Sequence, residues 1–126
     1  MMLRILVVDD SSFLHSILRI SLRRYCDCQI GYAKHGAEAL ETLREAEPDL
    51  ILLDVNMPVM SGLEFLAHLK EGGVLDRVPV IIVSTEGEEE DVIRGLEAGA
   101  TAYLRKPFKE VELHRLLDRV VGQAAG

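Results

Sequence analysis

Residues 50–62 read LILLDVNMPVMSG and are the most informative stretch of the chain. Leu50–Leu53 is a run of four aliphatic residues, too short to span a membrane and too apolar for an exposed sheet edge. Such a run is typical of a strand buried on both faces of a parallel sheet. It ends at a single carboxylate, Asp54, and the carboxyl ends of such strands are where open α/β sheets place their functional groups. We therefore expect Asp54 to lie in a functional site.

Similar short runs lie on both sides of this stretch, and a helical pattern follows each of them. The other runs are Ile5–Val8, Gln29–Ala33, Val80–Val83 and Thr101–Leu104. Strict alternation of strand and helix predicts a parallel sheet covered by helices on both faces, with right-handed connections. Gln29–Ala33 contains polar residues, which suits a sheet edge. We predict one domain over residues 1–126, a flavodoxin-like (βα)5 doubly wound parallel sheet with strand order 2-1-3-4-5.

The apolar spacing within the helical stretches predicts which side chains face the core. Ser11 and Ser12 can cap the first helix, while Gly72-Gly73 and Gly99 end the third and fourth. The expected core-facing residues, in chain order, are Leu14, Ile17, Leu18, Leu22 and Tyr25; Ala37, Leu40 and Leu43; Leu63, Leu66 and Ala67; Val92, Ile93 and Leu96; and Leu113, Leu116, Leu117 and Val120.

Composition narrows the class of protein. The chain has 126 residues, 48% of them hydrophobic and 28% charged, which is an ordinary globular composition. A formal net charge of −7 argues against a nucleic-acid binder, which needs clustered Lys and Arg. The sequence shows no signal peptide and no run of the length of a membrane span, and Cys26 and Cys28 fit reduced thiols. We expect a soluble cytoplasmic protein without membrane insertion.

Polar residues stand directly after four of the five predicted strands. Because the carboxyl ends of parallel strands share one edge of a sheet, we expect these side chains to converge. The set consists of Asp9, Asp10, Asp54, Ser84, Thr85 and Lys106. Three close carboxylates repel each other unless a cation compensates them, and a few hard oxygen ligands completed by water suit Mg²⁺. A divalent metal beside a lysine neutralises a phosphoryl group, so an aspartate here can act as its acceptor.

These residues carry a resemblance that covers nearly the whole chain. In order and separation, the motifs are similar to those of the receiver domain of two-component response regulators, in its single-domain CheY-like type. They are Asp9-Asp10, Asp54 with Met57-Pro58 and Gly62, Ser84, Gly99-Ala100, Tyr103 and Lys106-Pro107-Phe108.

The resemblance implies a role for each residue of the acidic cluster. Asp54 matches the phosphoacceptor, which takes a phosphoryl group from a phosphohistidine on a sensor histidine kinase or a histidine phosphotransfer protein. Asp10, Asp54 and the backbone carbonyl of Asn56 match the Mg²⁺ ligands, with Asp9 assisting through water. Lys106 matches the lysine that pairs with a phosphoryl oxygen, and its bond to Pro107 is typically cis in the family.

The resemblance also implies how the signal is passed on. Ser84 matches a hydroxyl that moves toward the phosphoryl group, and Tyr103 matches an aromatic residue that then turns inward. A downstream target would bind the face formed by the predicted fourth helix, the Thr101–Leu104 strand and the last helix. Asn56 and Glu86 are hypothesised to tune the lifetime of the acyl phosphate. The function that the resemblance implies is that of a phosphorylation-dependent switch in chemotaxis, motility or a phosphorelay. Such a protein catalyses its own phosphorylation and dephosphorylation without being a turnover enzyme.

Thr85 is a departure from the pattern, because alanine is common at this position in the chemotaxis type. Its β-branched side chain narrows access to Asp54. It is also a second hydroxyl beside the switch position, where spacing favours Ser84.

Three other functions fit the same fold less well. A flavin carrier needs a phosphate-binding loop after the first strand, where Asp9-Asp10 would repel a phosphate. A haloacid-dehalogenase-type hydrolase needs an aspartate two residues after the nucleophile, where Asn56 stands, and it needs a cap domain. A docking scaffold that is never phosphorylated would not need every site residue.

Overall fold

The computed structural model describes residues 2–55, 57, 59–85 and 87–125, with side chains as far as Val121. Strands and helices alternate along the chain, as predicted. They are β1 (Leu3–Val8), α1 (Ser12–Tyr25), β2 (Cys28–Ala33), α2 (Gly36–Glu45), β3 (Leu50–Asp54), α3 (Gly62–Glu71), the 3-10 helix η1 (Val74–Asp76), β4 (Val80–Ser84), α4 (Glu89–Glu97), β5 (Ala102–Arg105) and α5 (Glu110–Ala125). Across the described residues, no helix combines the length and the apolar character that crossing a membrane requires.

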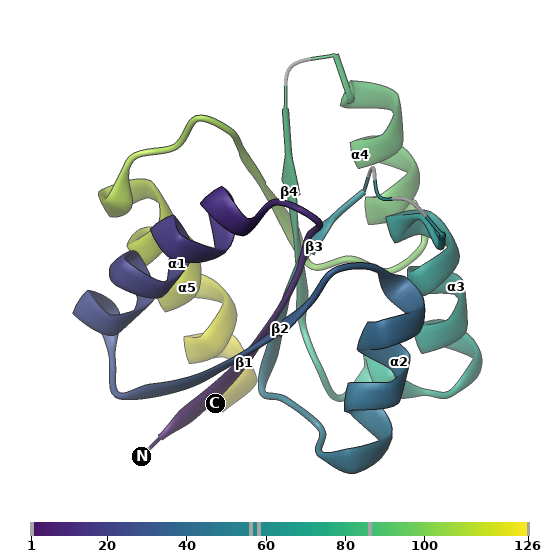
Figure 1. The fold of residues 1–126 in the computed structure, drawn as a ribbon, viewed down its shortest axis with the longest axis horizontal. Coiled ribbons are helices and arrows are strands. Elements are labelled where there is room, and N and C mark those ends of the chain that lie inside the picture. Colours follow the sequence, from purple (N-terminus) through teal and green to yellow (C-terminus); the bar gives the residue numbers. More distant parts are fainter. Residues whose placement is uncertain (1, 56, 58, 86, 126) are drawn as a thin grey trace.

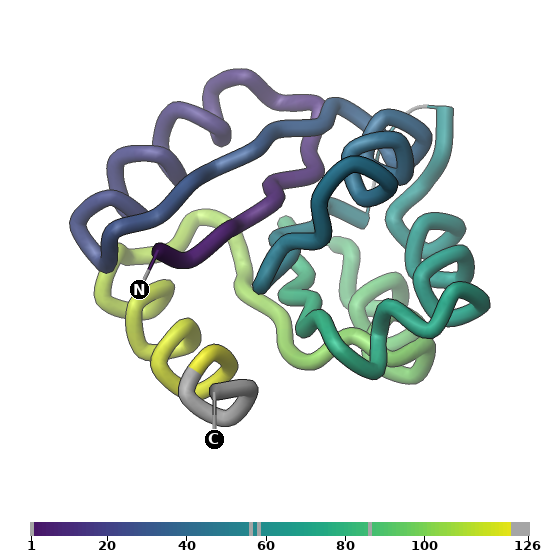
Figure 2. The backbone as a smooth tube through the Cα atoms, turned by 90° about the horizontal axis from the view of Figure 1, so that it is seen from below, coloured from purple at the N-terminus to yellow at the C-terminus, as the bar shows by residue number. Residues whose placement is uncertain are grey.

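The strands form one parallel sheet in the order β2-β1-β3-β4-β5, which confirms the predicted topology and the edge position of β2. Helices α1 and α5 cover one face of the sheet, and α2, α3 and α4 cover the other (Figure 1). Seen from below, the same two helical layers lie on opposite sides of the strands (Figure 2). The order places β3 in the centre, flanked by β1 and β4.

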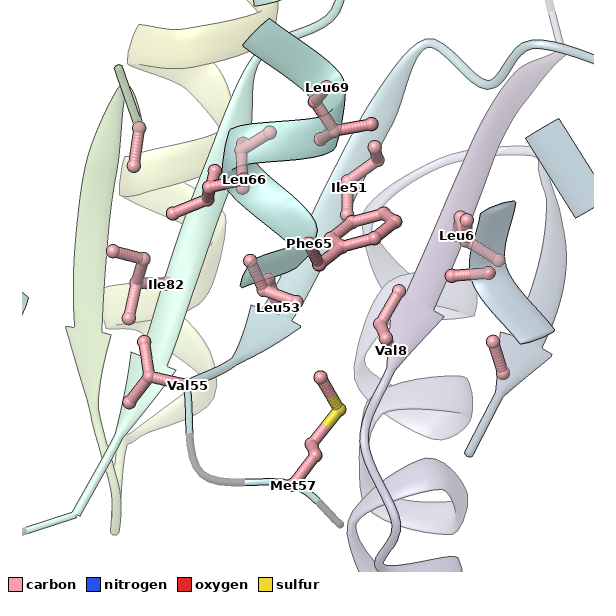
Figure 3. Close-up of a cluster of buried hydrophobic side chains, with 14 of the residues drawn as sticks. Leu6, Val8, Ile51, Leu53, Val55, Met57, Phe65, Leu66, Leu69 and Ile82 are labelled. Carbon is pink, nitrogen blue, oxygen red and sulfur yellow. The ribbon is translucent and has the colours of Figure 1, made fainter. Parts of the chain in front are cut away.

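Strand β3 is buried on both faces, and its residues alternate between two cores. Ile51 and Leu53 belong to the core under α2, α3 and α4, where Phe65 of α3 packs over them (Figure 3). Leu50 and Leu52 belong to the core under α1 and α5. Removing this much aliphatic surface from water, at about 25 cal/mol per Å² of apolar area, holds the strand in a fixed register. Asp54 is therefore anchored at the end of a strand that is buried on both faces.

Some helix residues that the periodicity predicted to be buried are exposed. In α4 only Val92 and Gly95 are fully buried, whereas the side chain of Ile93 is 55% exposed. Gly95 brings the helix so close to Ile82 that α4 contacts the sheet through a narrow face. The predictions for Ile17, Ala67, Ile93 and Leu96 as core residues are therefore wrong. Periodicity identifies an apolar stripe, but it does not show whether a neighbouring element covers it.

Local polar contacts define where the helices begin. The Ser11 hydroxyl accepts a hydrogen bond from the backbone N–H of Leu14, which confirms Ser11 as the cap of α1. The Ser61 hydroxyl accepts one from the N–H of Glu64 and caps α3 in the same way. The Lys106–Pro107 bond is cis, as the resemblance implied.

Candidate functional site

Three carboxylates meet at the carboxyl edge of the sheet. Asp54 ends β3, and Asp9 and Asp10 follow β1 directly. Val8 and Leu53 are partners in the β1–β3 register, so the next residues along, Asp9 and Asp54, lie side by side. One oxygen from each of the three aspartates lies within 4.8 Å of the others, and Asp9 and Asp54 are buried while Asp10 is exposed. The structure therefore assembles the acidic cluster that the sequence predicted.

Asp9 is held by two contacts and in turn positions Lys106. Its Oδ1 accepts a 2.7 Å hydrogen bond from the backbone N–H of Ser11. Its Oδ2 lies 3.4 Å from the Nζ of Lys106, whose side chain is 22% exposed. A largely buried ion pair of this kind fixes an ammonium group beside the acidic cluster. Negative charge in the cluster is thus partly balanced from within the chain.

Ser84 reaches the same edge from the next strand. It is the last residue of β4, it is buried, and it follows Val83, the partner of Asp54 in the β3–β4 register. The Ser84 carbonyl accepts a hydrogen bond from the backbone N–H of Lys106, which ties the ends of β4 and β5 together. The backbone of Lys106 is thereby held beside Ser84.

Tyr103 lies apart from the cluster, on β5. Its side chain is 52% exposed. Beside it is a groove of about 210 Å³ between α4 and the sheet, which reaches Ser84 and is lined by Val92, Ile93 and Leu96. Tyr103 itself lines this groove, together with Ser84, the candidate switch residue.

A second groove opens on the opposite side of the site. Phe13 and Ile17 of α1 line it together with Lys106, Pro107 and Phe108, and its volume is about 320 Å³. Phe13 is 76% exposed, which is unusual for a phenylalanine on a helix of a globular domain. Sequence reasoning missed this feature, because the α1 spacing was assigned only to the core.

Sequence reasoning also missed two contacts at the start of α4. One oxygen of the Glu88 carboxylate, Oε1, accepts hydrogen bonds from the Thr85 backbone N–H at 2.6 Å and from the Thr85 hydroxyl at 2.7 Å. The Thr-x-x-Glu spacing of a capping box is the sequence signal that could have revealed this contact.

The second contact is an ion pair, in which Arg105 Nη2 lies 3.7 Å from Glu89 Oε1. Backbone N–H groups of Glu89 and Gly87, followed by Arg105, lower the pKa of Glu89 below its ordinary value.

Two predicted site residues, Asn56 and Glu86, lie outside the described residues. Of the remainder, the structure brings together Asp9, Asp10, Asp54 and Lys106 by the contacts given above and places Ser84 at the same edge of the sheet by strand register.

The acidic cluster fits a divalent cation. Its donors are carboxylate oxygens, which suit Mg²⁺ and not the softer metals. The Lys106 ammonium group pairs with Asp9, and a single ammonium group does not balance three carboxylates. Asp9, Asp10 and Asp54 are the residues that would hold such an ion.

Comparison with known proteins defines the class. The family described as "Response regulator receiver domain" matches residues 5–118. A CheY homolog of Campylobacter jejuni, named as a chemotaxis protein, is 37% identical over 125 residues that cover 98% of this chain and 96% of that protein. The phosphate regulon regulator PhoB of Escherichia coli is 41% identical over 114 residues, which are 87% of this chain and 48% of PhoB.

Solved structures agree with the sequence comparison. The chemotaxis protein CheY4 of Vibrio cholerae superposes with a TM-score of 0.85 at 34% identity, covering 95% of this chain and 99% of that one. A putative response regulator from Chloroflexus aurantiacus superposes with a TM-score of 0.89 at 27% identity, covering 97% and 99%. The chain belongs to the response-regulator receiver family, and within it is CheY-like in fold and extent.

Proposed function

We propose that this receiver domain is a phosphorylation-dependent signalling switch that accepts a phosphoryl group on Asp54 from a phosphohistidine of a sensor kinase or a phosphotransfer protein. The observation that carries the proposal is the meeting of Asp9, Asp10 and Asp54 beside Lys106 at the carboxyl edge of the sheet. Receiver domains as a family act with histidine kinases and downstream targets, which supports this choice.

Each residue of the cluster has a defined task in the transfer. A carboxylate oxygen of Asp54 attacks the phosphorus, an O–P bond forms, and the P–N bond breaks with its electron pair returning to the imidazole of the donor. Lys106, positioned by Asp9, stabilises negative charge on the phosphoryl oxygens. A bound Mg²⁺ would supply further neutralisation of that charge. Because the protein accepts the group and is itself modified, we do not propose it to be a turnover enzyme.

Ser84 and Tyr103 are proposed to convert the new charge into a change of surface. The Ser84 hydroxyl is drawn toward the phosphoryl group, and the Tyr103 ring, which lines the same groove as Ser84 and Val92, then turns further into it. Reversing an equilibrium from 1:99 to 99:1 takes about 5.5 kcal/mol, whereas one hydrogen bond to a charged group contributes about 1.5–3 kcal/mol. Ser84 therefore has to act together with Lys106 to complete the shift.

Two exposed apolar surfaces suit the two partners of such a switch. The groove of Phe13, Ile17 and Pro107 includes Lys106, so it is continuous with the phosphoryl site and fits an apolar helix next to the donor histidine. On the other side, α4, β5 and α5 expose large apolar side chains, which suits a downstream protein. These side chains are Ile93, Leu96, Tyr103 and Val111.

The names of the relatives suggest the biological setting. The Campylobacter jejuni and Vibrio cholerae relatives are named as chemotaxis proteins, and their extent matches this chain. We propose a role in chemotaxis or motility, with a phosphorelay as the alternative. We propose further that the side chains of Asn56 and Glu86 tune the lifetime of the acyl phosphate. Equal dephosphorylation rates for the wild type, Asn56→Ala and Glu86→Ala would exclude that assignment.

The test of the proposed function is transfer of labelled phosphate from a phosphorylated histidine kinase in the presence of Mg²⁺. We expect the wild type and Asp76→Asn, which changes an exposed aspartate of η1, to take up label. We expect Asp54→Asn, or chelation of the metal, to abolish uptake. Undiminished labelling of Asp54→Asn would refute the function.

A further inference from the structure

The contact between Glu88 and Thr85 joins the start of α4 to the end of β4. Thr85 directly follows Ser84, so a shift of the Ser84 backbone that carries its hydroxyl toward Asp54 displaces the Thr85 backbone as well. Both donors of Thr85, its N–H at 2.6 Å and its hydroxyl at 2.7 Å, point to the same carboxylate oxygen of Glu88. A backbone bond from the Glu88 N–H to the Thr85 carbonyl, at 3.3 Å, closes the same turn.

We propose that Glu88 restrains the phosphoryl site of the resting protein by holding Thr85, so that phosphorylation of Asp54 has to break this contact before Ser84 can move. The inference rests on the proposed function and names a regulator of the same site. Glu88 acts through Thr85 and is a positioning residue.

Two features of the contact favour a restraint over an ordinary helix cap. In a capping box the hydroxyl accepts a hydrogen bond from the helix, whereas here the Thr85 hydroxyl donates to the carboxylate. The Glu88 side chain makes no capping hydrogen bond to α4. The side-chain contacts of Glu88 therefore restrain Thr85, directly after Ser84, and contribute little to the stability of the first turn of α4.

The negative charge of Glu88 also disfavours phosphorylation of Asp54. Glu88 places a carboxylate against the residue that follows the switch hydroxyl, and Thr85 lines both grooves that flank the site. A phosphoryl group on Asp54 brings further negative charge to this edge of the sheet, so it is repelled by Glu88. In the neighbouring Glu89–Arg105 ion pair both side chains are exposed and the charged atoms are 3.7 Å apart, so this pair restrains the segment much less.

The test measures binding of beryllofluoride, a stable mimic of a phosphoryl group on a carboxylate, with Mg²⁺ and by NMR titration. Glu88→Ala is compared with Glu90→Ala, which removes the same charge from the start of α4 without touching Thr85. We expect Glu88→Ala to bind about three- to tenfold more tightly than Glu90→Ala, the range that corresponds to losing a partly exposed charged hydrogen bond. A difference of less than twofold would overturn the proposal.

A second pair of variants isolates the hydroxyl. Thr85→Val keeps the shape of the side chain but removes the donor, and Thr85→Ser keeps the donor. We expect Thr85→Val to bind beryllofluoride more tightly than Thr85→Ser, and the opposite order would contradict the restraint. If Glu88 only supported the helix, Glu88→Ala would lower the free energy of unfolding and leave the affinity unchanged. Failure of the wild type to bind through Asp54 at all would refute the proposed function instead.

Discussion

Gly62 lies outside the acidic cluster, but its replacement should disturb the backbone that carries Asp54. A Cβ atom there would lie 2.6 Å from the carbonyl oxygen of Asp54 and 2.6 Å from the Cα of Val55, which are backbone atoms that cannot step aside. We expect Gly62→Ala to lower the free energy of unfolding by about 1–3 kcal/mol, the usual cost of overpacking, and to reduce phosphorylation of Asp54.

Urea denaturation and phosphotransfer measured on the same samples check this expectation. Gly72→Ala is the matched control, because a Cβ there meets no atom closer than 3.6 Å. Equal stability of the two variants would show that the β3–α3 connection accommodates the extra carbon.

At Val59 the backbone conformation itself is strained in the wild type. It has a φ of 66°, in the left-handed region that β-branched residues avoid, and its side chain is 79% exposed. Asparagine tolerates this conformation, so we expect Val59→Asn to raise the free energy of unfolding by about 1 kcal/mol. Val111→Asn, at an exposed position of α5, should give no such gain in the same urea experiment. A loss of stability in Val59→Asn would mean that the valine side chain contributes more than its backbone costs.

At the scale of elements, α1 and α5 are joined by a hydrogen bond whose strength depends on pH. The Tyr25 hydroxyl donates to Asp118 Oδ1 at 2.7 Å. Burial, and then this bond to a carboxylate, raise the pKa of Tyr25 from 10.0 to about 12. The folded protein thus favours the protonated phenol, so the resulting stability is complete below pH 10 and is lost as the pH rises through about 12.

Tyr25→Phe tests this link between the helices. We expect the variant to be less stable than the wild type by about 0.5–1 kcal/mol near pH 8, because an exposed hydrogen bond contributes little more. The gap should close as the pH approaches 12, when urea denaturation is repeated across that range. A gap that is independent of pH would assign the effect to packing, since His114 also lies against the Tyr25 ring.

The sequence predicts an element well where its side chains are buried on both faces, because the apolar run then indicates both the kind of element and its place in the fold. Leu50–Leu53 allowed the central strand and the position of Asp54 to be predicted, because a short run of four aliphatic residues bounded by polar residues is typical of a strand buried on both faces. Ile93 and Leu96 were mispredicted because the close approach at Gly95, which narrows the covered face of α4, is a property of two packed elements. The Thr-x-x-Glu spacing could have indicated the Glu88–Thr85 contact, but it does not show that the Thr85 hydroxyl donates to the carboxylate.

For the molecule as a whole, binding of Mg²⁺ should be coupled to stability. A cation that binds only the folded state adds about 2.7 kcal/mol to the free energy of unfolding at 100 times its dissociation constant. Without the metal, Asp9, Asp10 and Asp54 repel each other. We therefore expect Asp10→Asn to be slightly more stable than the wild type in chelator and to gain less from added Mg²⁺.

Thermal unfolding with and without Mg²⁺ measures both effects. Asp76→Asn removes the same charge far from the cluster and should respond to the metal as the wild type does. An equal gain for Asp10→Asn would place the metal outside the cluster.

If the signal enters at Asp54, phosphotransfer has to modify this residue, and the modified position can be located chemically. Borohydride reduces an acyl phosphate on aspartate to homoserine, which peptide mass spectrometry can assign to one position. After phosphotransfer from a histidine kinase, we predict homoserine at position 54 in the wild type and none in Asp54→Asn. Homoserine at position 9 or 10 instead, or phosphate on a serine, threonine or histidine with residue 54 unmodified, would exclude Asp54 as the phosphoacceptor.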